Sequence, residues 1–458
     1  MTEYSFTWES ALPHSTQDVF AWHARRGAFE RLNPPWRPVS VTSPATSLSD
    51  GTTITIKLPI VGPLGLPWTL RHTGVRIGEQ FCDEQISGPF RSWRHVHRFL
   101  PSGESSSVLR DEISYKPPLA GAAINPFLRA ELTRLFRYRH AILASDLRLH
   151  ARFTGAPRKR ILISGSSGFV GSALVAFLET AGHSVRRLVR RTPRDASERQ
   201  WDPVSGTIDP SAFDEIDAVI HLGGENLFAR RWSPQFKALI EESRVRSTRL
   251  LCETIASLKR KPEVFICASA TGFYGDTGSS VVDERASAGS GFLAETCQAW
   301  EDASNQALQG ASRLVHLRIG AVLNPRGGAL GKMLLPFSLG VGGPLGDGSQ
   351  YLSWISLQDL LGLFEYALMD ATLHGPCNAT APEPVTNKVF TKTLASVLRR
   401  PAFLPAPAPV LRLALGEVAD ALLLSSSRVI SSVLRERGYA FEHPTIEDAL
   451  RFELGRSR

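Results

Sequence analysis

The chain of 458 residues lacks the marks of several protein classes. Its five cysteines are scattered, and none stands in a Cys-x-x-Cys pair. This argues against a structural zinc site and a disulfide framework and fits free thiols in a reducing compartment. No apolar run approaches the ~18 residues of a membrane helix, and the first residues, MTEYSFTWES, lack the basic region and apolar core of an export signal. We therefore expect a cytoplasmic protein without a membrane span.

Charge of one sign is not concentrated in any segment. The net charge of +8 is modest for this length, and the basic residues are interspersed with acidic ones. No nucleic-acid recognition motif accompanies them, so we expect no nucleic-acid partner. The length itself is too great for one ordinary domain and predicts two or three.

What the chain does contain is an apolar strand running into three glycines, ILISGSSGFVG at residues 161–171. The first glycine allows a tight turn, the second lets backbone approach a phosphate, and the third lets a helix, expected over 172–180, pack close to the strand. Free N–H groups and the positive dipole end of that helix would face a pyrophosphate. The predicted cofactor-binding residues of this loop are Gly165, Ser167, Gly168, Phe169, Val170 and Gly171.

The end of the second strand, expected over 184–189, indicates which dinucleotide is bound. An acidic residue at this point binds the ribose of the unphosphorylated cofactor, whereas arginine pairs with a 2′-phosphate. Arg190 and Arg191 follow the strand, and no acidic residue occurs before Asp195. This favours NADP(H), and the alternative is a pair of solvated arginines.

The pattern of elements divides the chain into three predicted domains, 1–150, 158–385 and 386–458. The first combines short alternating strands with a long amphipathic helix over 126–149, which predicts an α+β fold with a curved sheet around a terminal helix. From 158 onward strands and helices alternate, which predicts an α/β, doubly wound parallel sheet of the Rossmann type. The expected strands there are 161–164, 184–189, 218–222, 264–268 and 314–318, with helices over 234–258 and 292–309. The last part is mostly helical, with a proline-rich break at 401–410.

Motifs in order along residues 160–454 carry a resemblance to one family. They are VIHLGGEN at 219–226, SRV at 243–245 with TR at 248–249, SATGFYG at 269–275, GVGGPLGDGSQYLSWI at 340–355 and NATAP at 378–382. The chain resembles extended short-chain dehydrogenases/reductases, in the branch of epimerase-family proteins with a C-terminal domain of unknown function.

The first domain carries a second resemblance. It resembles the SRPBCC (START-like, polyketide-cyclase-like) helix-grip fold through GAFERLNPPW at 27–36, GPFRSWRHVHRF at 88–99 and FRYRHAILASDL at 136–147. Helix-grip folds often leave a pocket, so Trp68, Trp93 and Phe99 would line an apolar cavity for a hydrophobic ligand, or else form an ordinary core.

The resemblance to the reductases implies further cofactor contacts. Leu222 and Gly223 would line the adenosine ribose and pyrophosphate, and Val322 would flank the nicotinamide. Glu225 would contact ribose or substrate, with an exposed loop acid as the alternative. Arg244 would reach from its helix toward the cofactor, with a surface ion pair to Glu241 or Glu242 as the alternative. Related reductases often dimerise through paired helices, so a homodimer is also an expectation.

The usual acid/base pair of these reductases is missing. It is a tyrosine with a lysine four residues later, and the corresponding positions here are Leu293 and Cys297 when the helix is anchored on Glu301. No Tyr-x-x-x-Lys occurs in 158–454. The candidate catalytic residues are therefore Thr271 and Tyr274, with a hydrogen-bonded turn and a packing residue as the respective alternatives.

Two functions remain open at this point. One is an NADP(H)-dependent oxidoreductase or epimerase acting on a small-molecule, in part hydrophobic, substrate. The other is a catalytically silent NADPH-binding sensor or scaffold. A separate pattern, His95 and His97 on one face of a strand, could ligate a metal, but no third ligand is evident and we predict no metal site.

Overall fold

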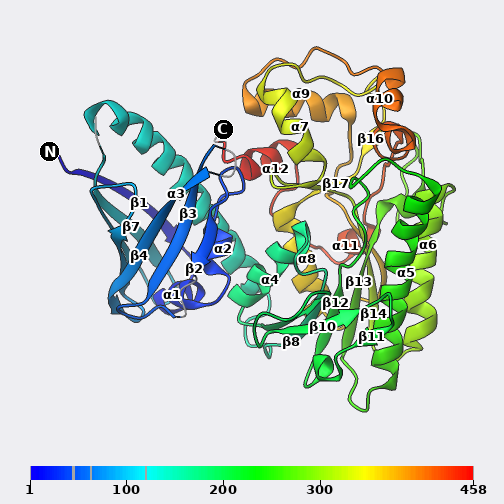
Figure 1. Cartoon of the computed structure of the whole chain (residues 1–458), viewed down its shortest axis with the longest axis horizontal. Helices are drawn as coiled ribbons and strands as arrows, with labels where there is room; N and C mark the ends of the chain where they lie inside the picture. The colour runs from blue at the N-terminus through cyan, green and yellow to red at the C-terminus, as the bar shows by residue number, and fades with distance from the viewer. Residues whose placement is uncertain (1, 44–46, 62–63, 119–120, 457–458) are drawn as a thin grey trace. The chain divides into compact units, whose positions relative to one another are not determined.

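The computed structural model describes residues 2–43, 47–61, 64–118 and 121–456 (Figure 1). The chain forms two compact units: the first runs to Gly155, and the second begins at Ala156. The segment Glu179–Gly182 is grouped with the first unit. Within the described residues, no helix combines the length and the apolar character needed to cross a membrane.

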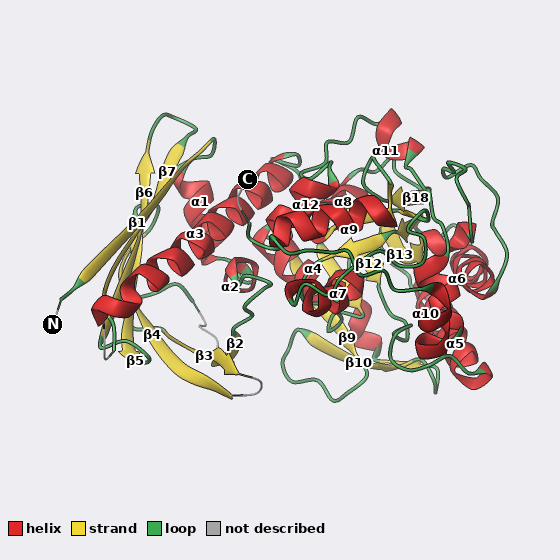
Figure 2. Ribbon diagram, turned by 90° about the horizontal axis from the view of Figure 1, so that it is seen from above, coloured by secondary structure: helices red, strands yellow, loops and turns green. Residues whose placement is uncertain are grey.

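The first unit is an antiparallel sheet of seven strands in the order β1-β7-β6-β5-β4-β3-β2. The strands are β1 (Tyr4–Leu12), β2 (Ser40–Ser43), β3 (Thr53–Val61), β4 (Leu64–Arg76), β5 (Gln80–Ser87), β6 (Ser92–Pro101) and β7 (Ser107–Lys116). The long helix α3 (Gly121–Ala151) crosses one face of this sheet (Figure 2). The predicted curved sheet with a terminal helix is confirmed; the short strand β2 was not expected.

Aromatic side chains fill the space between this sheet and its helices. β7 alternates buried and half-buried residues along its whole length, as a strand with one covered face must. Trp68 and Trp93 are in edge contact with ring centroids 5.1 Å apart, and Phe99 packs on Phe20 of α1 (Thr16–Ala24) at 5.4 Å. These rings belong to the core, and a cavity for a hydrophobic ligand stays a prediction.

The second unit contains a sheet of eight strands in the order β11-β10-β9-β8-β12-β13-β14-β18, parallel except at the edge strand β11. The strands are β8 (Arg160–Ser164), β9 (Ser184–Val189), β10 (Glu198–Asp202), β11 (Thr207–Ile208), β12 (Ala218–His221), β13 (Val264–Ala270), β14 (Arg313–Ile319) and β18 (Gly375–Ala379). The predicted doubly wound sheet is confirmed. β10 was missed because its sequence, ERQWD, has a single apolar side chain and no strand-like alternation.

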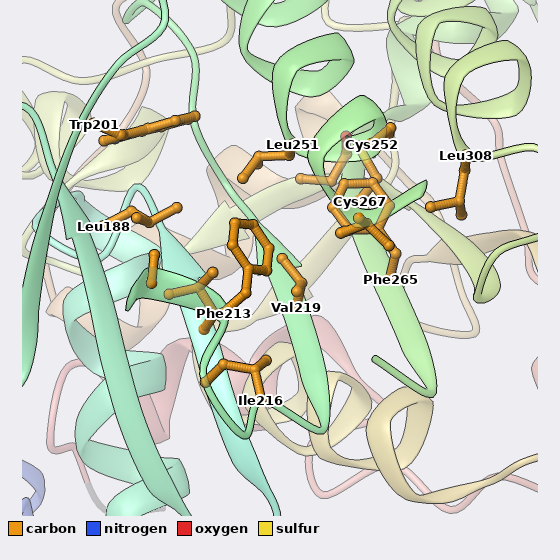
Figure 3. Close-up of a cluster of buried hydrophobic side chains, with 14 of the residues drawn as sticks. Leu188, Trp201, Phe213, Ile216, Val219, Leu251, Cys252, Phe265, Cys267 and Leu308 are labelled. Carbon is orange, nitrogen blue, oxygen red and sulfur yellow. Dashed lines mark hydrogen bonds between the residues drawn. The ribbon is translucent and has the colours of Figure 1, made fainter. Parts of the chain in front are cut away.

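Helices cover both faces of the parallel sheet, as right-handed crossovers in opposite directions require. They are α4 (Phe169–Thr180) and α8 (Leu357–Met369) on one face, with α5 (Pro234–Ser257) and α6 (Phe292–Leu308) on the other (Figure 1). Ser233 caps α5 by accepting a hydrogen bond from Phe236 N, and Pro234 occupies its first turn. Figure 3 shows the core beneath α5 and α6, where Val219 and Phe265 of the sheet approach Leu251.

Part of the chain beyond β14 builds a separate core around Trp354. The further strands beyond β14 are β15 (Ala321–Leu323), β16 (Tyr351–Leu352), β17 (Trp354–Ser356) and β19 (Val385–Thr386), and the further helices are α7 (Gly328–Ser338), α9 (Asn387–Leu398), α10 (Ala408–Leu415), α11 (Ser432–Glu436) and α12 (Ile446–Glu453). Phe337 and Trp354 pack in this core with Phe390 and Leu450. Residues on both sides of the predicted 385/386 boundary therefore share one core, and a third domain stays a prediction.

Candidate cofactor-binding site

The carboxyl ends of β8, β12 and β13 meet at one edge of the parallel sheet. The strand order reverses at β8, which pairs with β9 on one side and with β12 on the other. Open α/β sheets bind ligands outside the carboxyl ends of their strands at such a switch point. The predicted glycine loop follows β8, and Leu222, Gly223 and Glu225 follow β12.

The glycine loop is shaped so that no side chain fits between it and the chain around it. Gly165 has a φ of +73°, and a Cβ there would lie 2.7 Å from the carbonyl carbon of Leu222. A Cβ on Gly171 would overlap the carbonyl oxygen of Gly165. The loop is thereby held close to both the helix and the neighbouring strand end, while Ser167 and Gly168 remain exposed.

The helix after this loop begins at Phe169, three residues before the predicted start. The first intrahelical bond runs from Ser172 N to Gly168 O at 2.9 Å. The N–H groups of Phe169, Val170 and Gly171 precede that bond, and such groups in a first helical turn have no intrahelical partner. This loop and turn have the features that bind a pyrophosphate.

The two arginines after β9 have different surroundings. Arg191 donates to both carboxylate oxygens of Glu198 at 2.7 Å each, and Glu198 is 2% exposed. Hydrogen bonding to Glu198 raises the pKa of Arg191. Arg190 is exposed and forms no ion pair within the described part of the chain. Arg191 therefore anchors the 191–198 loop, and Arg190 is the arginine whose charge is available to a ligand.

The loop after β12 lies directly beside the glycine loop. Leu222 N donates to Ser164 O at 3.1 Å, which continues the pairing of β12 with β8. Leu222 and Gly223 are half-buried at this point, and the backbone N–H of Glu225 donates to Ser243 Oγ at 2.9 Å. The structure thus brings these predicted residues to the same edge as the glycine loop.

Arg244 of α5 supports the same loop from beneath. Its guanidinium donates to Glu225 O at 3.1 Å and to Ile240 O at 2.8 Å, and Cζ lies 5.2 Å from the ring centroid of Trp300. A Cβ on Gly224 would lie 3.0 Å from Arg244 Cζ, so the guanidinium packs closely on the backbone of this loop. The half-buried Arg244 forms no ion pair with Glu241 or Glu242, both of which are described; burial lowers its pKa.

His221 is a residue of this region whose role the sequence analysis missed. It is fully buried, with Nδ1 2.5 Å from Ser164 Oγ and Nε2 3.1 Å from Ser247 Oγ. Burial, reinforced by the charge of Arg244, lowers its pKa to about 3, so the ring is neutral. It joins the end of β8 to α5 at the switch point. Its position in the HLGGE motif was the available signal.

Tyr274, a candidate catalytic residue, uses its hydroxyl within the protein. The hydroxyl donates to Asn378 Oδ1 at 2.8 Å and accepts from Arg318 Nη1 at 2.8 Å. Arg318 also donates to both oxygens of Glu301, at 2.9 and 2.8 Å. Burial raises the pKa of Tyr274. These contacts favour the packing role over proton transfer.

Leu293 and Cys297, which stand where the usual tyrosine and lysine would be, face the 3-10 helix Thr271–Tyr274. A Cβ on Gly272 would lie 3.5 Å from Leu293 Cβ and 3.9 Å from Cys297 Sγ. Burial raises the pKa of Cys297 to about 11, with Glu301 adding to the effect, so the thiol stays protonated. Thr271 begins this 3-10 helix and is 8% exposed. Its hydroxyl has no hydrogen-bond partner among the described residues.

Val322 lies on β15, which pairs in parallel with β17. A Cβ on Gly328 would lie 3.0 Å from Val322 O, and one on Gly327 would lie 3.0 Å from the Phe169 ring. The turn after β15 is therefore packed against the start of α4. This arrangement places the predicted nicotinamide contact near the first turn of that helix.

Comparison with known families gives three matches along the chain. The NAD dependent epimerase/dehydratase family matches residues 161–372. The family described as polyketide cyclase / dehydrase and lipid transport matches residues 12–137. A domain of unknown function matches residues 406–453. An epimerase family protein of Mycobacterium tuberculosis is 45% identical over 296 residues, which are 65% of this chain and 98% of that protein.

Two solved structures are similar to the chain. A nucleoside-diphosphate sugar epimerase from Corynebacterium glutamicum has a TM-score of 0.82 at 33% identity and covers 98% of this chain and 90% of its own. Human epimerase family protein SDR39U1, solved with NADPH, has a TM-score of 0.59 at 34% identity and covers 64% of this chain and 98% of its own. Since relatives above 30% identity are matched over nearly their full length, this chain belongs to the NAD dependent epimerase/dehydratase family, among its epimerase family proteins.

Proposed function

We propose that the second unit binds NADP(H) at the carboxyl edge of its parallel sheet and performs oxidoreductase or epimerase chemistry on a small-molecule substrate. The observation that carries this proposal is the glycine loop, whose backbone excludes any side chain at Gly165 and Gly171 and leads into the first turn of α4. The human relative solved with NADPH supports the choice of cofactor. The exposed Arg190 is the group that would bind the 2′-phosphate.

Different residues of the site would bind the cofactor and orient the substrate. The N–H groups of the first turn of α4 would bind the pyrophosphate, and Arg244 holds the 222–225 loop in place from beneath. Bound NADP(H) supplies or accepts a hydride. Thr271, whose hydroxyl is not used by the described chain, hydrogen-bonds the substrate oxygen or the nicotinamide amide. Val322 would flank the nicotinamide.

A second candidate function, an NADPH-binding sensor or scaffold without turnover, is favoured by one set of contacts. The Tyr274 hydroxyl already donates one hydrogen bond and accepts another. Leu293 has no proton to transfer, and the Cys297 thiol is held protonated by burial. A protein with this set of side chains can bind the cofactor without a ready acid/base group.

The first experiment titrates the full-length protein with NADPH and NADH and follows cofactor fluorescence. We expect NADPH to bind more tightly than NADH, and Arg190→Glu to remove this preference, with a loss of about 10- to 100-fold for NADPH only. Arg158→Glu is the matched control, because Arg158 is exposed at the opposite end of β8. Equal binding of both cofactors by the wild type, or an equal loss in both variants, would contradict the proposed phosphate contact.

The second experiment separates the two candidate functions. The protein is mixed with NADPH and a panel of carbonyl compounds, and NADPH absorbance is followed over many turnovers. Steady consumption, slowed about 100-fold in Thr271→Val, supports the oxidoreductase. Tight NADPH binding without consumption across the panel supports the sensor.

A further inference from the structure

The first unit buries histidine and aspartate side chains on the face of its sheet that α3 covers. Asp83 of β5 is paired directly with His95 of β6, and His97 follows two residues later on the same face. His95 and His97 are 4% and 6% exposed, and Asp83 is half-buried. Antiparallel pairing therefore supplies the third residue that the sequence analysis did not identify beside the two histidines.

The potential ligand atoms of these three residues are close enough to share one ion. One nitrogen from each histidine and one oxygen of Asp83 all lie within 4.8 Å of one another. The distance from His97 Nε2 to Asp83 Oδ2 is 3.4 Å. Ligands bound tetrahedrally at roughly 2.1 Å from a zinc ion stand about 3.4 Å apart. One edge of such a tetrahedron is thus already formed, and small side-chain rotations would complete the other edges.

Partners outside the trio orient each of its members. Asp111 Oδ1 lies 2.8 Å from His95 Nε2 and 2.7 Å from His97 Nδ1. The second oxygen of Asp111 lies 2.5 Å from His140 Nε2. This leaves His95 Nδ1 and His97 Nε2 as the nitrogens not held by Asp111. Asp111 is hydrogen-bonded to His95 and lies beside His97 without a hydrogen bond to its Nδ1. A carboxylate that receives the outer N–H of an imidazole is the usual support of a histidine ligand to a metal.

Asp83 is oriented in the same way. Its Oδ1 lies 2.7 Å from His72 Nδ1, and its Oδ2 is the oxygen that faces His97. The side chains of His72 and Asp83 are 12% and 17% exposed, so this end of the cluster is reached from solvent. An ion can therefore enter beside Asp83 without unfolding the sheet.

An ordinary buried ion pair is the simpler explanation, and one distance argues against it. Charge-assisted hydrogen bonds between imidazolium and carboxylate are about 2.7–2.9 Å long. The contacts of Asp111 with His95 and His97 have this length, whereas Asp83 Oδ2 and His97 Nε2 stand 3.4 Å apart. An ion pair does not require this longer separation, whereas two ligands of one tetrahedral ion do.

We propose that Asp83, His95 and His97 bind a divalent transition-metal ion, with Zn²⁺ the ion best suited to two imidazoles and a carboxylate. Asp111, His72 and His140 are positioning residues that hold the ligands. Three protein ligands leave a fourth coordination position, which a water molecule or a ligand oxygen fills. The site lies wholly within the first unit and does not depend on the cofactor proposed for the second.

The test uses the full-length protein, freed of metal with a chelator and titrated with Zn²⁺ by calorimetry. We expect one high-affinity ion per chain. Asp83→Asn and His95→Gln should each weaken binding by about 100-fold or more, since each removes a ligand. Glu84→Gln is the matched control and should bind as the wild type does, because Glu84 lies next to Asp83 on the opposite face of β5 and pairs with Arg94 at 3.3 Å.

A spectroscopic measurement on the wild type keeps the proposal falsifiable if a variant fails to fold. Co²⁺ added to the metal-free protein should give the intense visible absorption of a four-coordinate site, and Zn²⁺ should abolish it stoichiometrically. Weak octahedral Co²⁺ absorption, or no binding, would overturn the proposal. Equal Zn²⁺ affinity in the wild type and both folded ligand variants would also overturn it, because binding would then be adventitious.

Discussion

Both units bury charged side chains, but only one of the two groups is closed by its own hydrogen bonds. In the second unit, Arg318 joins Glu301 to Tyr274 through contacts of 2.8–2.9 Å, and the Tyr274 hydroxyl donates a hydrogen bond to Asn378 Oδ1 at 2.8 Å. In the first unit, Asp83 and His97 face each other across 3.4 Å. A closed network is explained by folding alone, whereas a separation of 3.4 Å is that of two ligands on one tetrahedral ion.

The closed network should be the more sensitive to the loss of one member. Arg318→Met would leave Glu301 buried without its partner, so we expect a loss of about 3–5 kcal/mol in the free energy of unfolding. Urea denaturation of the wild type and the variant measures this. The double variant Glu301→Met with Arg318→Met should recover much of the loss, because no uncompensated charge remains.

A surface pair supplies the control for this experiment. Arg246 and Glu242 are exposed on α5 with N and O atoms 3.5 Å apart, and Arg246→Met should change the unfolding free energy by less than about 1 kcal/mol. If Arg318→Met were as mild as Arg246→Met, burial of the network would not carry the stability that we assign to it.

The open network should gain stability from an ion. At a Zn²⁺ concentration about 100 times its Kd, binding to the folded state alone adds about 2.7 kcal/mol. Thermal unfolding with and without Zn²⁺ should therefore show a higher Tm for the wild type and no shift for His97→Gln. An equal shift in Tm for the wild type and His97→Gln would mean that Zn²⁺ does not bind at this network, and the proposed site in the first unit would be wrong.

Tyr274→Phe separates structure from catalysis within the closed network. Removing the hydroxyl leaves buried groups of Arg318 and Asn378 without one partner each, and we expect a loss of about 2 kcal/mol in stability. NADPH affinity and any turnover should stay within about threefold of the wild type. A fall in turnover of 100-fold or more, the range of a lost general acid, would instead assign proton transfer to Tyr274.

His221 of the second unit is a buried imidazole that is neutral. Its pKa of about 3 in the folded protein lies below the value of about 6.5 in an unfolded chain. The unfolded chain therefore takes up the proton first, and folded stability falls as the pH drops from about 6.5 toward 3.

The slope of this loss should reach about 1.4 kcal/mol per pH unit. His221→Gln should flatten this part of the stability profile measured by urea denaturation between pH 7 and 4. His374→Gln is the control, because His374 is exposed. An unchanged profile in His221→Gln would show that the ring is not held neutral.

The sheet of the second unit could be predicted because its strands are short apolar runs placed between glycine turns and helices. The tight turn of the glycine loop could also be predicted from its three glycines, and the structure gives Gly165 the positive φ that such a turn requires. The first turn of α4 was missed because its start depends on how Gly168 closes onto Ser172, a backbone contact without a side-chain signal.

Contacts between distant residues were the part that could not be predicted. From the sequence, Arg191 is a candidate phosphate ligand. Its contact with Glu198 could not be foreseen, because Glu198 lies on a strand with no apolar pattern. Asp83 meets His95 only through the register of β5 with β6, which the hairpin between them determines. Cofactor binding, catalysis by Thr271 and Tyr274 and the domain boundaries remain predictions.

The packing of the glycine loop has a consequence for how the family evolves. Gly165 and Gly171 are required by contacts within the chain, since a Cβ at either position would collide with backbone atoms. Selection for a foldable protein is then enough to preserve them, even in a lineage that has given up its chemistry. Descendants that no longer turn over substrate should keep these glycines and drift first at exposed positions such as Arg190.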